Sequence, residues 1–311
     1  MSMIGHSKIR NSLTEAINNN KLSHAHIFVG EKGIGKSVLV KLTALKILGI
    51  NEIRDHVDII YWSLDKGKAS IGVNTVRSII EECNKKPFEG DNKVIIIENG
   101  HKITFQAQNA FLKTIEEPPL NVYIFILCEE LEGILDTIKS RCCIHKLKPL
   151  NDEDMMVFLR SEYPKIEDER LIVASAFGKG VPGKAKNLIE NKEFSIIRDI
   201  IFELIYKTKD VDTEIALQYE KFFNDYGSIH EEILDIIITV IRDIIIYKEV
   251  GDEKILINID KTSDIKDLAN MFSSSKLNDM IKVVDGTRNT LKNNVNSSLA
   301  FITMVLRMQE V

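Results

Sequence analysis

The chain has 311 residues, of which 44% are hydrophobic and 28% are charged, with 16 glycines and only 6 prolines. This composition is typical of a folded globular protein and excludes the collagen-like, mucin-like and disordered classes. Lys and Arg together number 41 and Asp and Glu 46, so the formal net charge of −5 gives no electrostatic footprint for tight, nonspecific nucleic-acid binding by this chain alone.

The first 150 residues alternate between strand-like and helix-like segments. Strands are predicted at 25–30, 57–63, 93–99, 122–128 and 143–147, and helices at 37–48, 73–84 and 105–116. The run 93–99 is almost wholly apolar, as strands covered on both faces are. The alternation predicts an α/β domain with a mostly parallel sheet and crossover helices.

Strand signals fade after Pro149, and the rest of the chain has helical patterns. Three short helices are predicted at 151–163, 168–177 and 183–191, the first capped by Asn151 or Asp152. Longer helices follow at 195–207, 211–225, 229–250, 263–285 and 287–309, with a short extended link at 256–260. The sequence therefore predicts three domains, at 1–150, 151–193 and 194–311, the last an all-helical bundle or collar.

The segment 30–37, GEKGIGKS, fits the P-loop pattern G-x-x-x-x-G-K-[ST] in full. The glycines let the backbone curl so that several N–H groups point at one anion, and the following helix adds its positive N-terminal dipole. In this motif the lysine reaches the β- and γ-phosphates and the hydroxyl ligates Mg²⁺. The sequence predicts a site for ATP or ADP with Mg²⁺, built from Gly30, Gly33, Gly35, Lys36, Ser37 and Val38, with Ser37 as the metal ligand.

An acidic residue, Glu98, ends the predicted strand at 93–99 and is followed by Asn99. Glu98 is suited to hold a metal-bound water and joins the predicted nucleotide site. Asn99 cannot act as a general base, because a neutral amide takes up no proton near pH 7. This pair favours a pocket that binds nucleotide but turns it over slowly or not at all. The alternative is a working ATPase that positions water with another residue.

The four cysteines, at 83, 128, 142 and 143, form no C-x-x-C motif, which favours reduced thiols over disulfides or a zinc site. The N-terminus lacks a long apolar segment and resembles mature sequence. No uninterrupted apolar run approaches the roughly 18 residues of a membrane span. We therefore expect a cytoplasmic protein with no membrane partner.

The stretch HKITFQAQNAFLKTIEEPP (101–119), followed by SRC (140–142), resembles the clamp-loader branch of the AAA+ ATPases. The opening residues 4–30 and the stretch 291–306 are also similar to that family, the latter to its collar helix. The resemblance implies an α/β P-loop AAA+ domain with a parallel sheet at 1–150. It also implies a small helical lid domain at 151–193 and an all-α collar domain at 194–311.

Within this branch, the chain is most similar to the delta-prime type of bacterial DNA polymerase III subunit, because three catalytic positions of the motor subunits are altered. Their catalytic Glu falls at Asn99, their sensor-1 Thr at Cys128 with Glu129 beside it, and their sensor-2 Arg near Gly183. The Arg of the SRC motif is retained as Arg141. The four-cysteine zinc module of the motor subunits is absent, so no zinc is expected.

The resemblance implies a stator subunit of a bacterial clamp loader with little or no ATPase activity of its own. Arg141 would act in trans as an arginine finger on a neighbour's ATP, since a guanidinium is always charged and can fork onto phosphate oxygens. The alternative is a structural role, in which Arg141 forms an ion pair with a local carboxylate such as Asp136. The implied partners are the gamma/tau motor subunits and the delta subunit, with the sliding clamp and primed DNA contacted mainly through the assembled complex.

Two enzymatic alternatives stay open from the sequence alone. One is a catalytically active clamp-loader ATPase that uses Glu98 despite Asn99. The other is a different AAA+ remodeller, such as a branch-migration motor, that forms its own ring. The adjacent Glu116 and Glu117 could be mistaken for a catalytic pair, but the prolines after them favour the end of a helix at an intersubunit surface.

Overall fold

The computed structural model describes residues 3–65, 67–209, 213–293 and 295–311, and the chain divides into two compact units. The first unit contains 1–162 and 178–185, and the second contains 163–177 and 186–311. The segment 151–193 therefore contributes residues to both. Within the described ranges, no helix is long and apolar enough to cross a membrane.

The first unit is built on a five-stranded sheet in the order β2-β3-β4-β1-β5, and every neighbouring pair is parallel. Its strands are β1 (Ala25–Val29), β2 (Ile59–Trp62), β3 (Lys93–Ile97), β4 (Val122–Cys128) and β5 (Cys143–Lys146). The predicted parallel sheet is thus confirmed. Because all strands run the same way, their carboxyl ends meet at one edge, where ligands bind in open α/β sheets.

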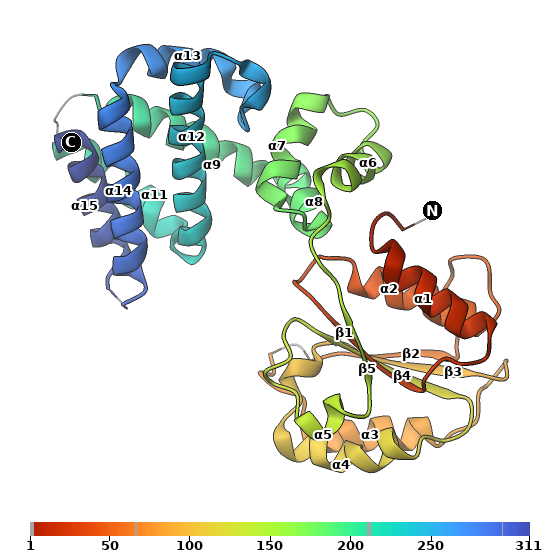
Figure 1. Cartoon of the computed structure of the whole chain (residues 1–311). Coiled ribbons are helices and arrows are strands. Elements are labelled where there is room, and N and C mark those ends of the chain that lie inside the picture. The colour runs from red at the N-terminus through yellow and green to blue at the C-terminus, as the bar shows by residue number, and fades with distance from the viewer. Residues whose placement is uncertain (1–2, 66, 210–212, 294) are drawn as a thin grey trace. The chain divides into compact units, whose positions relative to one another are not determined.

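Helices cover both faces of this sheet (Figure 1). One face carries α1 (Ser7–Asn18) and α2 (Lys36–Ile47), and the other carries α3 (Val73–Cys83), α4 (Phe105–Glu116) and the short α5 (Asp136–Lys139). Each face has its own apolar core, and β1 to β4 contribute side chains to them. Two buried faces explain the almost unbroken apolar runs in β3 and β4. The predicted elements did not include α1, whose one fully buried residue is Leu13.

A buried carboxylate, Asp58, fixes the loop that leads into β3. Its side chain accepts hydrogen bonds from the backbone N–H groups of Phe88, Glu89 (3.0 Å) and Gly90 (3.0 Å). Burial alone would raise the pKa of Asp58, but these three bonds and nearby His56 hold it below its ordinary value. The carboxylate is therefore a charged acceptor that the loop folds around.

We expect Asp58→Ala to lower the free energy of unfolding of this unit by about 2 kcal/mol, because three donors lose their acceptor. Chemical denaturation followed by fluorescence of Trp62, the only tryptophan, measures the change within this unit. Asp55→Asn is the matched control, since Asp55 is 94% exposed and pairs with Lys41 at the surface. Equal stability of the Asp58→Ala protein and the wild type would contradict this role.

Three short helices follow β5, within one or two residues of the predicted limits: α6 (Asp152–Glu162), α7 (Asp168–Gly178) and α8 (Pro182–Glu190). The predicted cap is confirmed, because the side-chain oxygen of Asn151 accepts a 2.7 Å hydrogen bond from the N–H of Asp154. Such a bond satisfies one of the free donors of the first helical turn.

The remaining helices form one apolar core in the second unit. They are α9 (Lys192–Lys207), α10 (Thr213–Gln218), α11 (Glu220–Asp225), α12 (His230–Val250), α13 (Thr262–Met271), α14 (Ser274–Leu291) and α15 (Ser297–Glu310). At its centre the rings of Phe223 and Phe301 stack with centroids 4.3 Å apart. An all-helical C-terminal part is confirmed.

Several predicted helix limits in this part are wrong. The segment 211–225 is two helices, and its residues 211 and 212 lie outside the described residues. The segment 263–285 is broken where Ser273 accepts a hydrogen bond from the N–H of Lys276 and starts α14, which runs on to Leu291. The last helix begins later than predicted, because Asn296 caps α15 in the same way.

The predicted extended link at 256–260 is also wrong. It contains the start of a short turn of 3₁₀ helix at Ile259–Lys261 and is fixed by the buried Asp243 of α12. That carboxylate accepts hydrogen bonds from the backbone N–H (2.7 Å) and side-chain amide (2.8 Å) of Asn258. A tertiary contact of this kind overrides the local apolar pattern.

Candidate nucleotide site

The P-loop lies at the carboxyl edge of the sheet, between β1 and α2. Gly33 and Gly35 both have positive φ, at 87° and 107°, a backbone conformation that glycine adopts without strain. Gly35 is the N-cap of α2, so the free N–H groups of the first helical turn face the loop. The predicted anion cradle is therefore present in the backbone.

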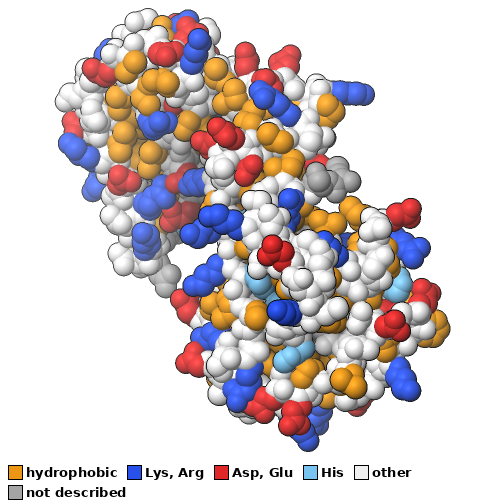
Figure 2. Space-filling model, turned by 45° about the vertical axis from the view of Figure 1, so that its right-hand side comes forward, with side chains coloured by type: hydrophobic (Ala, Val, Ile, Leu, Met, Phe, Trp, Pro, Cys, Tyr) orange, Lys and Arg blue, Asp and Glu red, His pale blue; other side chains and the backbone are white. Residues whose placement is uncertain are grey.

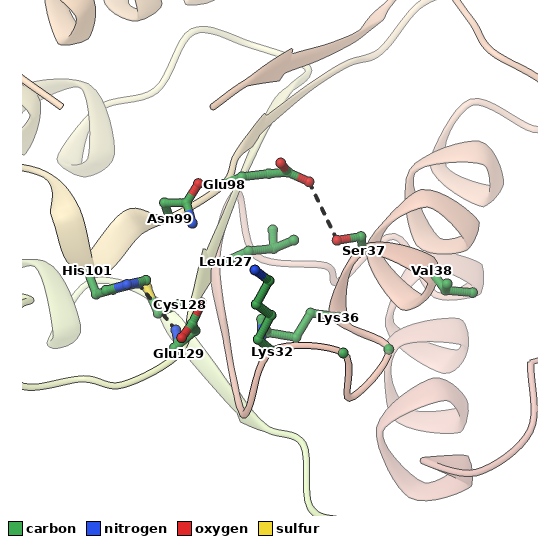
Figure 3. A pocket seen from close by; sticks show the side chains of 12 residues that line it. Lys32, Lys36, Ser37, Val38, Glu98, Asn99, His101, Leu127, Cys128 and Glu129 are labelled. Atoms are coloured by element: carbon green, nitrogen blue, oxygen red, sulfur yellow. Dashed lines mark hydrogen bonds between the residues drawn. The ribbon is translucent and has the colours of Figure 1, made fainter. Parts of the chain in front are cut away.

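A pocket of about 330 Å³ opens beside this loop, as Figure 3 shows. Of the predicted residues, Gly33, Gly35, Lys36, Ser37, Val38 and Glu98 line it, whereas Gly30 does not. Asn99, Cys128 and Glu129, which the resemblance aligned with altered catalytic positions of the motor subunits, also line it. The sequence did not predict the remaining lining residues: Lys32, His101 and Leu127. His101 follows β3 and Leu127 lies in β4, so the strand order was the missing information.

The predicted metal ligand, Ser37, and Glu98, which was expected to hold a metal-bound water, face each other across the pocket. The hydroxyl of Ser37 donates a 3.5 Å hydrogen bond to Oε1 of Glu98, drawn as a dashed line in Figure 3. A hydroxyl and a carboxylate are oxygen ligands of the kind that Mg²⁺ takes in NTP sites. These two side chains fit the role that the sequence predicted for them.

Lys36 is turned back onto the loop that it follows. Its Nζ donates hydrogen bonds to the carbonyl oxygens of Gly30 (2.6 Å) and Glu31 (3.0 Å). Burial lowers the pKa of Lys36, and the charge of Glu129 is the largest of the effects that oppose this. A bound phosphate would replace the two carbonyl oxygens as the hydrogen-bond partner of this ammonium group.

Asn99 lines the pocket next to Glu98, in the left-handed backbone conformation that asparagine tolerates (φ 55°). Its amide gives the pocket a hydrogen-bonding group and no general base.

The position expected for a sensor-2 arginine, Gly183, touches the P-loop itself. Its N–H donates a 2.9 Å hydrogen bond to the carbonyl oxygen of Gly33. A Cβ atom added at Gly183 would lie 2.7 Å from the Cα of Gly33. No side chain fits there unless the backbone moves, so the absence of an arginine follows from this close approach. Next to it, Lys184 forms an ion pair with Glu31 of the loop.

The N-terminal segment also reaches the P-loop. Nε2 of His6 lies 3.1 Å from the carbonyl oxygen of Ile34, and Arg10 donates to the carbonyl oxygen of Met3. A Cβ atom at Gly35 would lie 3.2 Å from the terminal methyl of Met3. These contacts bring residues 3–10 to the loop, as the resemblance of the opening segment implies.

Arg141 lies outside the pocket lining, just after α5, with 40% of its side chain exposed. Its Nε pairs with Oε1 of Glu116 at 2.6 Å, and its Nη1 donates to the carbonyl oxygen of Thr137 at 2.9 Å. The alternative that Arg141 pairs with a local carboxylate is therefore confirmed, but the partner is Glu116; Asp136, named as an example, pairs with Lys139 instead. Glu116 is the last residue of α4, as predicted for a helix end.

Among the residues that the structure describes, no group of three or more His, Cys, Asp or Glu side chains is arranged to hold a metal ion. All four cysteines are free. Burial raises the pKa of Cys83, Cys128 and Cys142 to about 12, so these thiols are poor metal ligands and poor nucleophiles.

Two family models match the chain. The model described as "DNA polymerase III, delta subunit" matches residues 5–151, and "DNA polymerase III, delta subunit, C terminal" matches residues 199–310. The delta' subunit of DNA polymerase III from Bacillus subtilis is 26% identical, over 97% of this chain and 96% of that subunit. The chain belongs to the DNA polymerase III delta' family.

Gamma-type relatives are also similar to this chain. The DNA polymerase III gamma subunit of Buchnera aphidicola subsp. Schizaphis graminum is 28% identical, over 61% of this chain and 57% of that subunit. A gamma-subunit-related protein of Thermotoga maritima is a structural neighbour with a TM-score of 0.48 and 16% identity, covering 97% of this chain and 98% of that one. The fold of this delta'-family chain is a parallel five-stranded sheet domain with a P-loop, followed by helices.

Proposed function

We propose that this chain is the stator subunit of a bacterial clamp loader. It would help to assemble the ATP-dependent ring that loads the sliding clamp on primed DNA, and supply Arg141 to the ATP site of a neighbouring subunit. One observation carries the proposal. The chain combines a pocket lined by Asn99, where the resemblance places the catalytic glutamate of the motor subunits, with an arginine, Arg141, that is exposed outside that pocket.

In its own pocket this chain would bind ATP or ADP weakly and hydrolyse little. Lys36 and the loop N–H groups would hold phosphates, and Ser37 and Glu98 would hold Mg²⁺, which neutralises phosphate charge when bound. Asn99 cannot take the proton of an attacking water. With Gly183 at the sensor-2 position, one charge-assisted contact that would tighten nucleotide binding is also missing.

The partners belong to the same proposal. The helices of 194–311 would form the oligomeric collar and those of 151–193 the lid, and the complex would contain gamma/tau and delta subunits in the bacterial cytoplasm. Exposed apolar residues of the helical part support a collar contact: Tyr206, Leu217, Val250 and Leu299. Figure 2 shows acidic and basic side chains interspersed on the visible face, which supports contact with the clamp and DNA through the assembly.

The test uses this chain reconstituted with the motor and delta subunits of its own organism. We expect Lys36→Ala in this chain to leave DNA-stimulated ATP turnover of the assembly within about twofold of wild type, because its own site contributes little. The same substitution at a motor P-loop is the positive control. We also expect the isolated chain to be a monomer without ATPase activity. ATP turnover by the chain alone, abolished by Lys36→Ala, would instead make it a motor.

A further inference from the structure

Glu129 follows β4, the strand that lies between β3 and β1 in the sheet. The P-loop begins directly opposite, because Val29 pairs with Cys128 and the N–H of Gly30 donates a 3.2 Å hydrogen bond to the carbonyl oxygen of Cys128. The backbone of Glu129 is held in place, since its N–H donates to Nδ1 of His101 at 3.3 Å. Glu129 is therefore fixed next to the first residue of the loop.

The P-loop lysine contacts the same residue of the loop, Gly30. Nζ of Lys36 lies 2.6 Å from the carbonyl oxygen of Gly30, and the N–H of Gly30 donates the hydrogen bond to Cys128, the residue before Glu129. Consistent with this, Glu129 raises the pKa of Lys36 more than any other neighbouring charge, although burial lowers it overall. Figure 3 shows Glu129 and His101 on the wall of the pocket opposite α2.

The carboxylates of this pocket differ in what could neutralise them. Glu98 faces the Ser37 hydroxyl, so a bound Mg²⁺ would offset its charge. Glu129 shares the pocket with two lysines, Lys32 of the loop and the motif lysine, Lys36. In a P-loop that lysine contacts the β- and γ-phosphates, so a carboxylate beside it also lies beside the terminal phosphate of ATP. Like charges in a partly buried site repel strongly.

We propose that Glu129 makes this site selective for a nucleoside diphosphate over a nucleoside triphosphate. The carboxylate takes part of the place that the γ-phosphate takes beside Lys36, so ADP with Mg²⁺ binds and ATP is disfavoured. This inference rests on nucleotide binding by the P-loop, as proposed above. It identifies Glu129 as the specificity-determining residue and explains how a complete P-loop motif serves a subunit that does not turn over ATP.

The experiment compares the dissociation constants of Mg-ADP and Mg-ATP for the full chain by isothermal titration. We expect the wild type to bind ADP at least about tenfold more tightly than ATP, and Glu129→Gln to reduce this ratio to about one by strengthening ATP binding. Glutamine keeps the size of the side chain and removes only its charge. Glu117→Gln is the matched control, because Glu117 is an exposed carboxylate outside the pocket. Lys36→Ala should weaken both nucleotides.

An unchanged ADP-to-ATP ratio in the Glu129→Gln protein would overturn the assignment. So would the absence of any binding of either nucleotide, at millimolar concentration, by both proteins. Neither result bears on the stator role, which depends on assembly and on Arg141. Gain of ATP binding only in Glu129→Gln supports the assignment, and Trp62 fluorescence verifies that each variant is folded.

Discussion

Replacement of Arg141 by alanine is expected to slow ATP hydrolysis at the neighbouring subunit's site by about a thousandfold. An arginine finger places a delocalised positive charge where negative charge spreads over the transferred phosphoryl group. Lysine cannot reproduce the planar fork of donors, so Arg141→Lys should recover only a small part of the rate.

The contacts of Arg141 support this expectation. It follows a four-residue helix, α5, and its position is fixed by the contacts of Nη1 with Thr137 and Ser140. Glu116 holds its Nε from the end of α4. With 40% of the side chain exposed, a guanidinium held in this way is pre-oriented and accessible to a partner. Glu116→Gln would weaken this hold and leave the cation in place.

The measurement needs an assembly in which the motor next to this chain is the only subunit with an intact P-loop lysine. Single-turnover hydrolysis then reports one site. Lys139→Ala is the matched control, because it removes a nearby cation that pairs with Asp136 at the surface. Glu116→Gln is expected to reduce the rate much less than Arg141→Ala does. Wild-type turnover in the Arg141→Ala assembly would show that the arginine forms only the local ion pair with Glu116.

The sheet and the P-loop were predictable because their signals are local. β3 and β4 are buried runs in which every residue except Lys93 is apolar, and the P-loop motif lies in one continuous segment. The end of α4 at Glu116 could also be located, because two prolines follow shortly after it. In such segments the sequence pattern and the tertiary structure impose the same requirement.

The remaining features depend on residues that are far apart in the chain. Nothing in the sequence near Gly183 indicates that its backbone meets Gly33, and Arg141 pairs with Glu116 because α4 and α5 are neighbours on one face of the sheet. The helix breaks at Ser273 and Asn296 have a different cause. Both residues are common N-caps, but the apolar periodicity continues through them and hides the new helix start.

The first unit should become less stable on acidification, because two histidines, His26 of β1 and His145 of β5, contact each other. Nδ1 of His26 lies 2.9 Å from Nε2 of His145, and Nε2 of His26 lies 2.8 Å from the carbonyl oxygen of Ser23. Since the carbonyl requires a donor, Nε2 of His26 carries the proton, and Nδ1 accepts from His145. This arrangement holds only while His26 is neutral.

Burial is the main cause that lowers the pKa of His26 from 6.5 to about 4. The hydrogen bond to the carbonyl of Ser23 raises this pKa, whereas the neighbouring His145 and His24 lower it further. Burial also lowers the pKa of His145. The native state therefore resists protonation that the unfolded chain accepts below pH 6.5. The contribution of neutral His26 to the free energy of unfolding is fully present above pH 6.5. It decreases as the pH falls toward 4, by about 3 kcal/mol from His26 alone.

Denaturation followed by Trp62 fluorescence between pH 7.5 and 4 tests this, with His26→Phe as the variant. Phenylalanine can retain the ring packing against Phe28 and Phe125 but cannot take up a proton. We expect it to be less stable than wild type at pH 7.5, because Ser23 and His145 lose a partner, and to lose less stability on acidification. His230→Gln is the control, since His230 belongs to the second unit and contacts a different carbonyl, that of Gly227. Equal pH slopes for His26→Phe and wild type would mean that carboxylates elsewhere cause the acid sensitivity.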